Sequence, residues 1–287
     1  MWDEERRVPT PESKILTPHP LTHFPTPPLR MYYYIYDTFL TDKKYERVLA
    51  AVETRLTDLG ISGKIGRLTP FTNARGLIRD EIRRGVETVI VVGNDETVAK
   101  VVEGIGDAKL TLGIIPIGTS ISIARSLGIP EGADACDVLS KRLTQKIDLG
   151  MVNGRFFLSQ VRFTGSNVSL ESDGKFRVSM PATDCDVIIS NLRRKQTDEE
   201  GGGYAAGDPM DGWLDALITP RSGGIMQVFQ RKEQRTASVI PIRRISVTSP
   251  EPFSVIADGR EFMNDTLSIE VVPEKLRIIT GRMRVFA

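Results

Sequence analysis

The chain has 287 residues, of which 40% are hydrophobic and 26% charged, so it can form one large globular domain or two smaller ones. A formal net charge of +1, with lysine and arginine scattered along the chain, argues against a nucleic-acid partner. No apolar run approaches the ~20 residues of a membrane-spanning helix, and the N-terminus lacks a secretory signal. These features predict a cytoplasmic protein with no transmembrane segment.

The few histidines and cysteines restrict the chemistry further. Both histidines, His19 and His23, lie in the proline-rich N-terminal segment. The rest of the chain therefore offers no Ser-His-Asp triad, no histidine base and no histidine-ligated zinc site. Cys136 and Cys185 are far apart and outside any CxxC pair, so we interpret them as free thiols in a reducing compartment.

Residues 1–30 form a segment of their own. This segment holds seven of the 17 prolines and has no apolar periodicity, which predicts a flexible tail. We expect the fold to begin at Met31. The sequence leaves open whether the tail belongs to the native protein.

Strand and helix patterns alternate in the segment that follows. Predicted strands cover 32–36, 64–68, 88–92 and 111–115, and predicted helices cover 45–59, 77–82, 98–105 and 121–127. Four successive β-α units indicate parallel strands joined by right-handed crossovers. Residues 31–143 are therefore predicted to form an α/β domain that binds its ligand at the carboxyl ends of the strands.

The apolar period changes to two near residue 146. The segments 147–152 and 156–163 flank Asn153-Gly154, which is a strong hairpin signal. Further predicted strands cover 176–180, 187–190, 214–218, 239–242, 245–248, 253–256, 267–272 and 276–280. The pattern predicts an antiparallel β-sandwich over residues 144–287, whose last strand can pack back on the first domain. Residues 195–209 are predicted to be a mobile loop or a lid.

The turn after the third predicted strand is the first candidate for chemistry. Its sequence, Gly93-Asn94-Asp95-Glu96-Thr97, ends a strand and opens a helix. The backbone amides and the positive end of such a helix can bind an anion. A tight turn in which an aspartate or threonine caps the helix explains the same residues equally well.

Four further motifs follow in order. They are residues 112–119 with 124–130, residues 146–150 with 152–157, residues 211–215, and Asp258-Gly259. Together the five motifs resemble the catalytic domain of diacylglycerol kinases and of related bacterial lipid kinases, over roughly residues 31–287 and most specifically over 114–157. The resemblance implies a cleft between the two domains that binds ATP and Mg²⁺. It also implies transfer of the γ-phosphate of ATP to the hydroxyl of a lipid at a membrane surface. Whether the protein forms a homodimer is left open.

The resemblance assigns roles to particular residues. It places the nucleotide at Thr69, Gly93, Asn94, Asp95, Glu96, Thr97, Gly118 and Thr119. It places a structural magnesium ion at Asp211, although an aspartate in a β-turn is an equally good interpretation of that residue. It assigns the acceptor hydroxyl to Asp258 or Glu261.

The chain departs from the family's pattern around the phosphates. Asn94 and Glu96 stand at glycine positions of the phosphate-binding turn, and Glu96 adds a negative charge there. Ile121 and Ser122 replace an Asn-Asp pair. The Asn-Pro-x-Ser-Gly turn expected after the first strand is replaced by residues 36–38.

The position of the general base differs too. Arg260 stands where the family has a glutamate, and Glu261 follows it. In an extended segment neighbouring side chains point to opposite faces, so Glu261 reaches the site only through a one-residue bulge. Three hypotheses stay open: a divergent ATP-dependent lipid kinase, a pseudokinase that binds nucleotide or lipid without catalysis, and an NAD kinase-like enzyme, which fits residues 147–157 less well.

Overall fold

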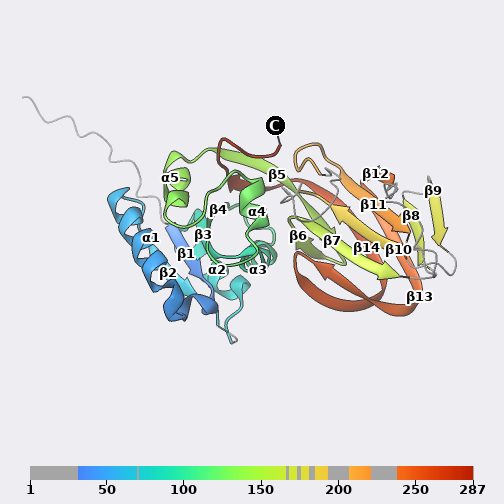
Figure 1. The fold of residues 1–287 in the computed structure, drawn as a ribbon, viewed down its shortest axis with the longest axis horizontal. Helices are drawn as coiled ribbons and strands as arrows, with labels where there is room; N and C mark the ends of the chain where they lie inside the picture. The colour runs from blue at the N-terminus through green and yellow to red at the C-terminus, as the bar shows by residue number, and fades with distance from the viewer. Residues whose placement is uncertain are drawn as a thin grey trace, which may run out of the picture.

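The computed structural model describes residues 32–69, 71–165, 168–172, 176–180, 185–192, 207–220 and 238–286. The predicted tail and most of the predicted loop 195–209 lie outside these residues. The described chain forms two halves side by side, one with helices around parallel strands and one built of antiparallel strands (Figure 1). The predicted fold class, a parallel α/β half followed by an antiparallel β half, is confirmed.

The N-terminal half contains a parallel sheet. Its strands are β1 (Tyr32–Tyr36), β2 (Lys64–Arg67), β3 (Thr88–Gly93) and β4 (Thr111–Pro116), in the spatial order β2-β1-β3-β4. Its helices are α1 (Glu46–Asp58), α2 (Ala74–Ile82), α3 (Asp95–Ile105), α4 (Ser122–Ser126) and α5 (Asp134–Lys141), with short 3-10 turns at Thr38–Thr41 and Lys43–Tyr45. Helix α1 packs against α5 and α2 against α3, as right-handed crossovers on opposite faces require.

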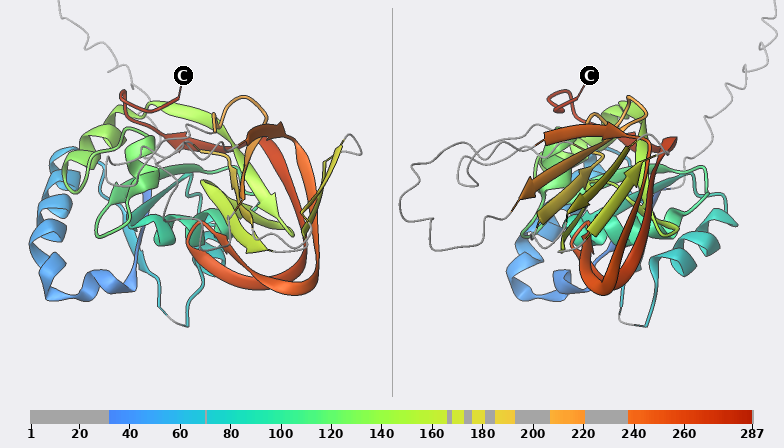
Figure 2. Two further views of the ribbon diagram at one scale, coloured as in Figure 1. Left: turned by 45° about the vertical axis from the view of Figure 1, so that its right-hand side comes forward. Right: turned by 90° about the vertical axis from the view of Figure 1, so that its right-hand side faces the viewer.

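The C-terminal half is a curved antiparallel sheet around its own apolar core. Its strands are β5 (Thr144–Val152), β6 (Arg155–Phe157), β7 (Gln160–Gly165), β8 (Val168–Ser172), β9 (Phe176–Met180), β10 (Cys185–Ser190), β11 (Leu214–Pro220), β12 (Ser238–Ile242), β13 (Arg244–Ala257) and β14 (Arg260–Ile279). The main order is β12-β11-β10-β7-β13-β14, with β8 added to β13 and β5 added to β14. The long strands β13 and β14 bend around this half (Figure 2).

Strand β14 joins the two halves. Its last residues, Arg277 and Ile278, pair in parallel with Thr111 and Leu112 of β4, while β13 and β5 pair with it in antiparallel fashion. One continuous sheet therefore runs through both halves. The start of β14, at Arg260, pairs with Ala257 of β13 and is tied to α3 by an ion pair with Glu103.

The central strands of the N-terminal half are buried throughout, which explains their continuous apolar sequence. Every residue of β1, β3 and β4 is buried, as expected for parallel strands with helices on both faces. Even the tyrosines of β1 follow this rule, and the Tyr34 hydroxyl donates to the carbonyl of Ile61. Burial also raises the pKa of Tyr36 to about 12.

Several details differ from the sequence analysis. The predicted strands 245–248 and 253–256 are parts of β13, and 267–272 and 276–280 are parts of β14. Asn153-Gly154 forms the expected turn, with φ of 46° and 77°. The expected second strand of that hairpin, 156–163, is interrupted, because β6 ends at Phe157 and β7 begins at Gln160. Helix α5 and strand β8 are not predicted by the sequence pattern at all.

Candidate functional site

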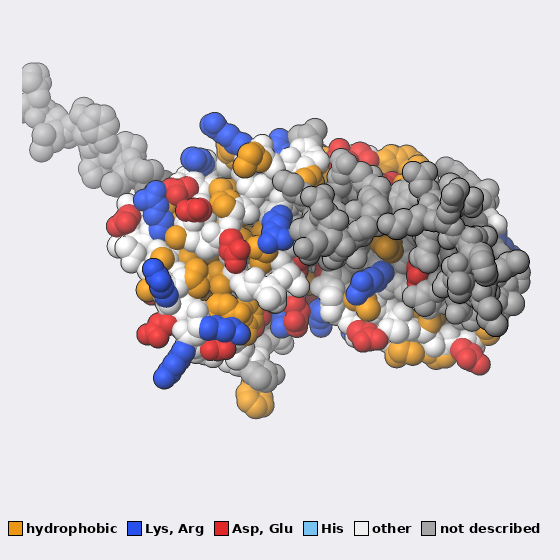
Figure 3. All heavy atoms as spheres, in the orientation of Figure 1, with side chains coloured by type: hydrophobic (Ala, Val, Ile, Leu, Met, Phe, Trp, Pro, Cys, Tyr) orange, Lys and Arg blue, Asp and Glu red, His pale blue; other side chains and the backbone are white. Residues whose placement is uncertain are grey.

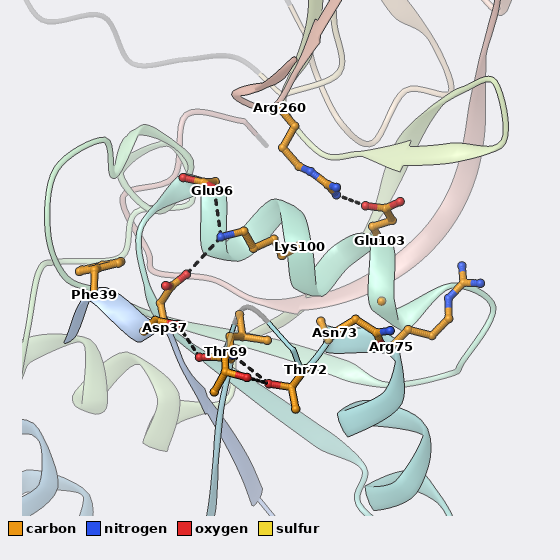
Figure 4. Close-up of a pocket in the computed structure, with 14 residues that line it drawn as sticks. Asp37, Phe39, Thr69, Thr72, Asn73, Arg75, Glu96, Lys100, Glu103 and Arg260 are labelled. Carbon is orange, nitrogen blue, oxygen red and sulfur yellow. Dashed lines mark hydrogen bonds and ion pairs between the residues drawn. The ribbon is translucent and has the colours of Figure 1, made fainter. Parts of the chain in front are cut away.

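A cavity of about 980 Å³ lies at the carboxyl ends of β1 and β2 and beside α3; we call it the cleft cavity. Its walls come from the turn after β1, the segment between β2 and α2, one face of α3 and the start of β14 (Figure 4). Six of its lining residues are charged: Asp37, Arg75, Glu96, Lys100, Glu103 and Arg260. This is the edge at which parallel sheets bind ligands.

The turn between β3 and α3 is closed on itself by a capping box. The Asn94 side chain accepts a hydrogen bond from the Thr97 N–H at 3.1 Å, and the Thr97 hydroxyl accepts one from the Asn94 N–H at 3.2 Å. Gly93 permits this contact, because a Cβ there would collide with Thr97 Oγ1. The first-turn amides that a bound anion would use are partly satisfied by the turn's own side chains.

Asp95 is buried and caps a neighbouring helix. Its carboxylate accepts hydrogen bonds from the N–H groups of Ser122 and Ile123, at 2.9 and 3.0 Å, and from the Ser122 hydroxyl at 2.6 Å. These residues begin α4, and the N–H of Asp95 itself donates to the Ser120 carbonyl at 2.8 Å. Of the two roles left open for Asp95, the contacts support the capping role, toward α4 rather than α3.

A lysine and two carboxylates lie in the wall of the cavity. Lys100 Nζ is 2.9 Å from Glu96 Oε1 and 3.7 Å from Asp37 Oδ2 (Figure 4). The Asp37 carboxylate also accepts a hydrogen bond from the Thr97 hydroxyl at 2.9 Å. Because Asp37 is only 7% exposed, Lys100 and this hydroxyl are needed to balance its charge.

Arg260 reaches the cavity from the start of β14. Its guanidinium forms an ion pair with the carboxylate of Glu103 on α3 (Figure 4). This pair connects the two halves across the cavity. At the position where the resemblance places a general base, the protein therefore has a cation that cannot accept a proton.

Asp258 holds the backbone and does not line the cleft cavity. Its carboxylate accepts hydrogen bonds from the N–H groups of Leu158, Ser159 and Gln160, at 2.6, 2.9 and 2.9 Å. These three donors lie at the break between β6 and β7. The contacts give Asp258 an architectural role in place of the expected role at the acceptor hydroxyl.

Glu261 also lies away from the cavity. Its carboxylate accepts a hydrogen bond from the Ser254 hydroxyl on β13. The β13–β14 register runs without a shift from Phe253 opposite Asn264 to Ala257 opposite Arg260. The bulge that would turn Glu261 toward the cavity is therefore absent from this stretch, and the structure does not bring this residue to the site.

Of the remaining residues expected to contact the nucleotide, Thr69 lines the cleft cavity, whereas Gly118 and Thr119 do not. The Thr69 hydroxyl is 2.6 Å from that of Thr72. Gly118 lies behind the ring of Phe39, because a Cβ there would be 3.1 Å from that ring, and its φ is 101°. Thr119 is exposed.

Four charged residues of the cavity are absent from the sequence-based site, and one of them, Arg75, carries no motif that would have indicated it. Asp37 directly follows β1, so the rule for the carboxyl ends of parallel strands could have found it. Lys100 lies four residues after Glu96 on α3, the spacing of a helical ion pair. Glu103 offers no such signal, because its partner is 157 residues away in the sequence.

Asp211 lies in a second cavity, of about 590 Å³. Its Oδ1 accepts a hydrogen bond from the Trp213 N–H at 2.8 Å, the contact of an aspartate in a turn. Burial raises the pKa of its carboxyl group, and repulsion from Asp208, Asp215 and Asp148 adds to this effect. Among the described residues, no three His, Cys, Asp or Glu side chains are placed to hold a metal ion.

Comparison with known proteins agrees with this architecture. Residues 32–152 match the diacylglycerol kinase catalytic domain. The diacylglycerol kinase of Bacillus subtilis is 31% identical over 119 residues, which are 40% of this chain and 39% of that protein. A putative lipid kinase of Streptococcus pneumoniae is 29% identical over 240 residues, which are 79% of this chain and 76% of that protein.

Residues 32–152 are thus similar to the diacylglycerol kinase catalytic domain, and the chain as a whole resembles lipid kinases.

Solved structures show the same fold. A putative diacylglycerol kinase from Bacillus anthracis has a TM-score of 0.72 and 18% identity, and the match covers 89% of this chain and 97% of that one. An NAD kinase from Archaeoglobus fulgidus, solved in complex with ATP, has a lower TM-score of 0.53 and 17% identity, with 88% and 95% covered. The matched part of the chain spans only 39% of the B. subtilis diacylglycerol kinase and 30% of a YegS-like lipid kinase from Pseudomonas aeruginosa. No helix in the described part of the chain is long and apolar enough to cross a membrane.

Similarity to the diacylglycerol kinase catalytic domain suggests ATP as the nucleotide, so the fit of a magnesium triphosphate to this turn can be examined. Such a ligand needs free amides at the helix start and carboxylate oxygens for the cation. Here the amides of Asn94, Asp95 and Thr97 all donate within the protein. The Asp95 carboxylate is engaged by α4. The residues of this lipid kinase-like chain do not fit a magnesium triphosphate at the β3–α3 turn.

Proposed function

We propose that this protein is a pseudokinase of the diacylglycerol kinase superfamily, a binding module that keeps the cleft and does not transfer phosphate. The observation that carries the proposal is the closed β3–α3 turn. Three of its amides and the Asp95 carboxylate have partners inside the protein. A triphosphate would have to break these contacts before it gained its own.

The charges around the turn support the same conclusion. Glu96 lines the cleft cavity, and Lys100 pairs with it and with Asp37. A carboxylate ~4 Å from a phosphate repels it by about 1 kcal/mol in water, and by more in a cleft that excludes water. Lys100 cannot offset this repulsion fully, because it already balances the nearly buried Asp37.

The residues that the resemblance assigns to the general base do not supply one either. Proton removal from a lipid hydroxyl needs an acceptor within hydrogen-bond reach. Arg260 offers none and is held by Glu103, while Asp258 and Glu261 face backbone amides and Ser254 respectively. The cavity keeps enough volume for a small ligand, so binding without turnover is the function these residues support best.

The test has a binding arm and a transfer arm. Calorimetric titration of ATP with Mg²⁺ measures affinity, and radiolabelled phosphate transfer to a panel of lipids in mixed micelles measures turnover. We expect weak or undetectable ATP binding and no transfer above background, with the diacylglycerol kinase of B. subtilis as the positive control. Any lipid contact is then peripheral, at a membrane surface.

The alternative is a divergent, active lipid kinase, and one result would establish it. Robust transfer by the unaltered protein that disappears in Glu261→Gln would overturn the proposal and make Glu261 a displaced base. Arg260→Glu by itself should not restore transfer, because the closed turn remains. Combining it with Asn94→Gly and Glu96→Gly tests whether opening both parts of the cleft recovers turnover.

A further inference from the structure

The N-terminal half has another cavity, apart from the cleft cavity and from the cavity at Asp211. It has no described lining residue in common with the cleft cavity. It has a volume of about 610 Å³ and lies between the end of α4, helix α5 and the C-terminal segment; we call it the C-terminal cavity. The C-terminal end of the chain lies at the top of Figure 1, near β5 and α5. Volumes of about 300–1,000 Å³ are those of small-molecule sites.

The wall of this cavity is held together by a close crossing of two backbones. The Gly281 N–H donates to the Leu127 carbonyl at 2.9 Å, and the Val285 N–H donates to the Ser126 carbonyl at 3.0 Å. A Cβ at Gly281 would collide with the carbonyl oxygen of Gly128, so only glycine permits this approach. The C-terminal segment is therefore fixed against the end of α4 and forms a defined wall.

The lining combines apolar and cationic side chains. Ile129, Pro130, Val138 and Met283 supply apolar surface, and Met283 is 84% exposed. Lys and Arg side chains lie next to apolar ones along the upper edge of this half in the space-filling view (Figure 3). An apolar surface beside concentrated positive charge matches a ligand with a hydrocarbon chain and an anionic head.

The cations of the C-terminal cavity have no carboxylate partners within the described part of the chain. Arg125, Lys141 and Arg282 line it and are exposed, and none of them forms an ion pair with a described residue. No lining residue is acidic. Three like charges around one cavity repel each other, and an anion between them would relieve that repulsion.

A buried hydroxyl adds an independent observation. Thr280 belongs to the cavity wall, is 0% exposed, and its Oγ1 has no hydrogen-bond partner. A buried polar group without a partner costs about 1–3 kcal/mol. Such groups are rare in folded proteins. Because Oγ1 is closed off from the empty cavity, a ligand supplies the missing partner only when this part of the wall opens.

We propose that the C-terminal cavity binds a single-chain amphiphile with a carboxylate head, such as a long-chain fatty acid anion. The acyl chain packs on Ile129, Val138 and Met283, and the carboxylate lies among the three cations on the side of Thr280. A single acyl chain suits the volume better than a two-chain phospholipid does. The inference does not rest on the proposed function of the cleft cavity.

Calorimetric titration with sodium laurate below its micelle threshold tests the proposal on the full chain. Two matched probes separate the parts of the ligand: 1-dodecanol has the chain without the charge, and acetate has the charge without the chain. We expect laurate to bind, dodecanol to bind at least ~10-fold more weakly, equivalent to ~1.4 kcal/mol, and acetate not to bind detectably. Equal affinity for laurate and dodecanol, or no laurate binding, would overturn the proposal.

Variants locate the site. The triple variant Arg125→Gln, Lys141→Gln, Arg282→Gln should lower laurate affinity at least ~10-fold. Its matched control is Arg162→Gln, which removes an exposed arginine of β7 without a described ion pair and should leave affinity within ~2-fold. All four side chains are exposed, so thermal melting should show that each variant is folded. An equal loss in Arg162→Gln would place the binding elsewhere.

Thr280→Val removes the hydroxyl and keeps the shape of the side chain. We expect laurate affinity to fall ~5-fold, with a melting temperature that is unchanged or higher, because an unpaired hydroxyl does not stabilise the fold. A lower melting temperature with unchanged affinity would show that Thr280 has a structural partner and no ligand. Binding to anionic phosphatidylglycerol vesicles without binding of free laurate would identify a membrane-docking surface and also reject the proposal.

Discussion

The two cavities of the N-terminal half treat their charges in opposite ways. In the cleft cavity Lys100 pairs with both Asp37 and Glu96, and Arg260 pairs with Glu103. Arg75 is left without a described ion pair. In the C-terminal cavity the cations form no ion pair with a described residue, and the described lining contains no carboxylate. A site whose charges are already paired must break contacts to accept an ion, whereas a site of unpaired charges gains contacts.

The position of a cavity in the fold and the pairing of its charges are therefore separate properties. The cleft cavity lies at the edge of the sheet where parallel α/β sheets bind ligands, yet most of its charged side chains pair with each other. The C-terminal cavity has no motif of its own, yet it offers apolar surface, positive charge and an unpaired hydroxyl. Position in the fold is therefore a weaker guide to binding than the balance of charge at the site.

The largest expected effect concerns Asp258, which fixes the turn that presents Arg260 to the cleft cavity. Asp258→Ala leaves three backbone N–H groups without their acceptor, and we expect a loss of about 3 kcal/mol or more in the free energy of unfolding. Urea denaturation measures this loss. The control Glu261→Gln should stay within ~0.5 kcal/mol, because that side chain is exposed. Similar stability of both variants would remove the anchor role of Asp258.

Freeing the backbone amides of the β3–α3 turn should let the cleft cavity accept an anion, as we propose for the C-terminal cavity. Asn94→Gly removes the capping side chain, and Glu96→Gly removes the negative charge beside Lys100. We expect the double variant to bind ATP at least ~10-fold more tightly than the unaltered protein, a gain of ~1.4 kcal/mol in calorimetry. Submicromolar ATP binding by the unaltered protein would refute the idea that this turn is closed to phosphate.

Removing one cation from each cavity compares the two sites directly. Lys100→Gln leaves the nearly buried Asp37 without its ion-pair partner and should cost ~1 kcal/mol in the free energy of unfolding. Lys141→Gln removes a cation without a described partner and should change stability by less than ~0.5 kcal/mol, or raise it slightly. Equal losses in chemical denaturation would mean that the cations of both cavities are paired to the same degree.

The smallest effect is expected from deleting residues 1–30, which lie outside the described residues. The shortened chain keeps both cavities and should melt within a couple of degrees of the full chain, because proline-rich segments without apolar periodicity contribute little to a core. Differential scanning calorimetry measures the shift. Loss of folding, or loss of laurate binding alone, would show that the tail contacts the body or the C-terminal cavity.

Local patterns were sufficient to predict most of the elements. The β-branched run that ends at Val92 and the apolar helical spacing from Val98 to Ile105 belong to β3 and α3 as observed. Helix α5 escaped prediction because it is only eight residues long, which is too short for its apolar spacing to stand out as a helical period. Strand β8 is shorter still, and such brief segments carry little periodicity.

Amino-acid sequence alone determined the order of elements, the change from a parallel to an antiparallel half and the resemblance to lipid kinases, because these depend on periodicity and on short motifs. Only the tertiary structure decided what the motif residues do. Asp95 finds its partner Ser122 27 residues away, Asp258 finds Leu158 100 residues away, and Arg260 finds Glu103 157 residues away. The sequence shows the same aspartate or glutamate whether its carboxylate binds an ion or caps a helix. Its role depends on which donors the fold brings within hydrogen-bond distance.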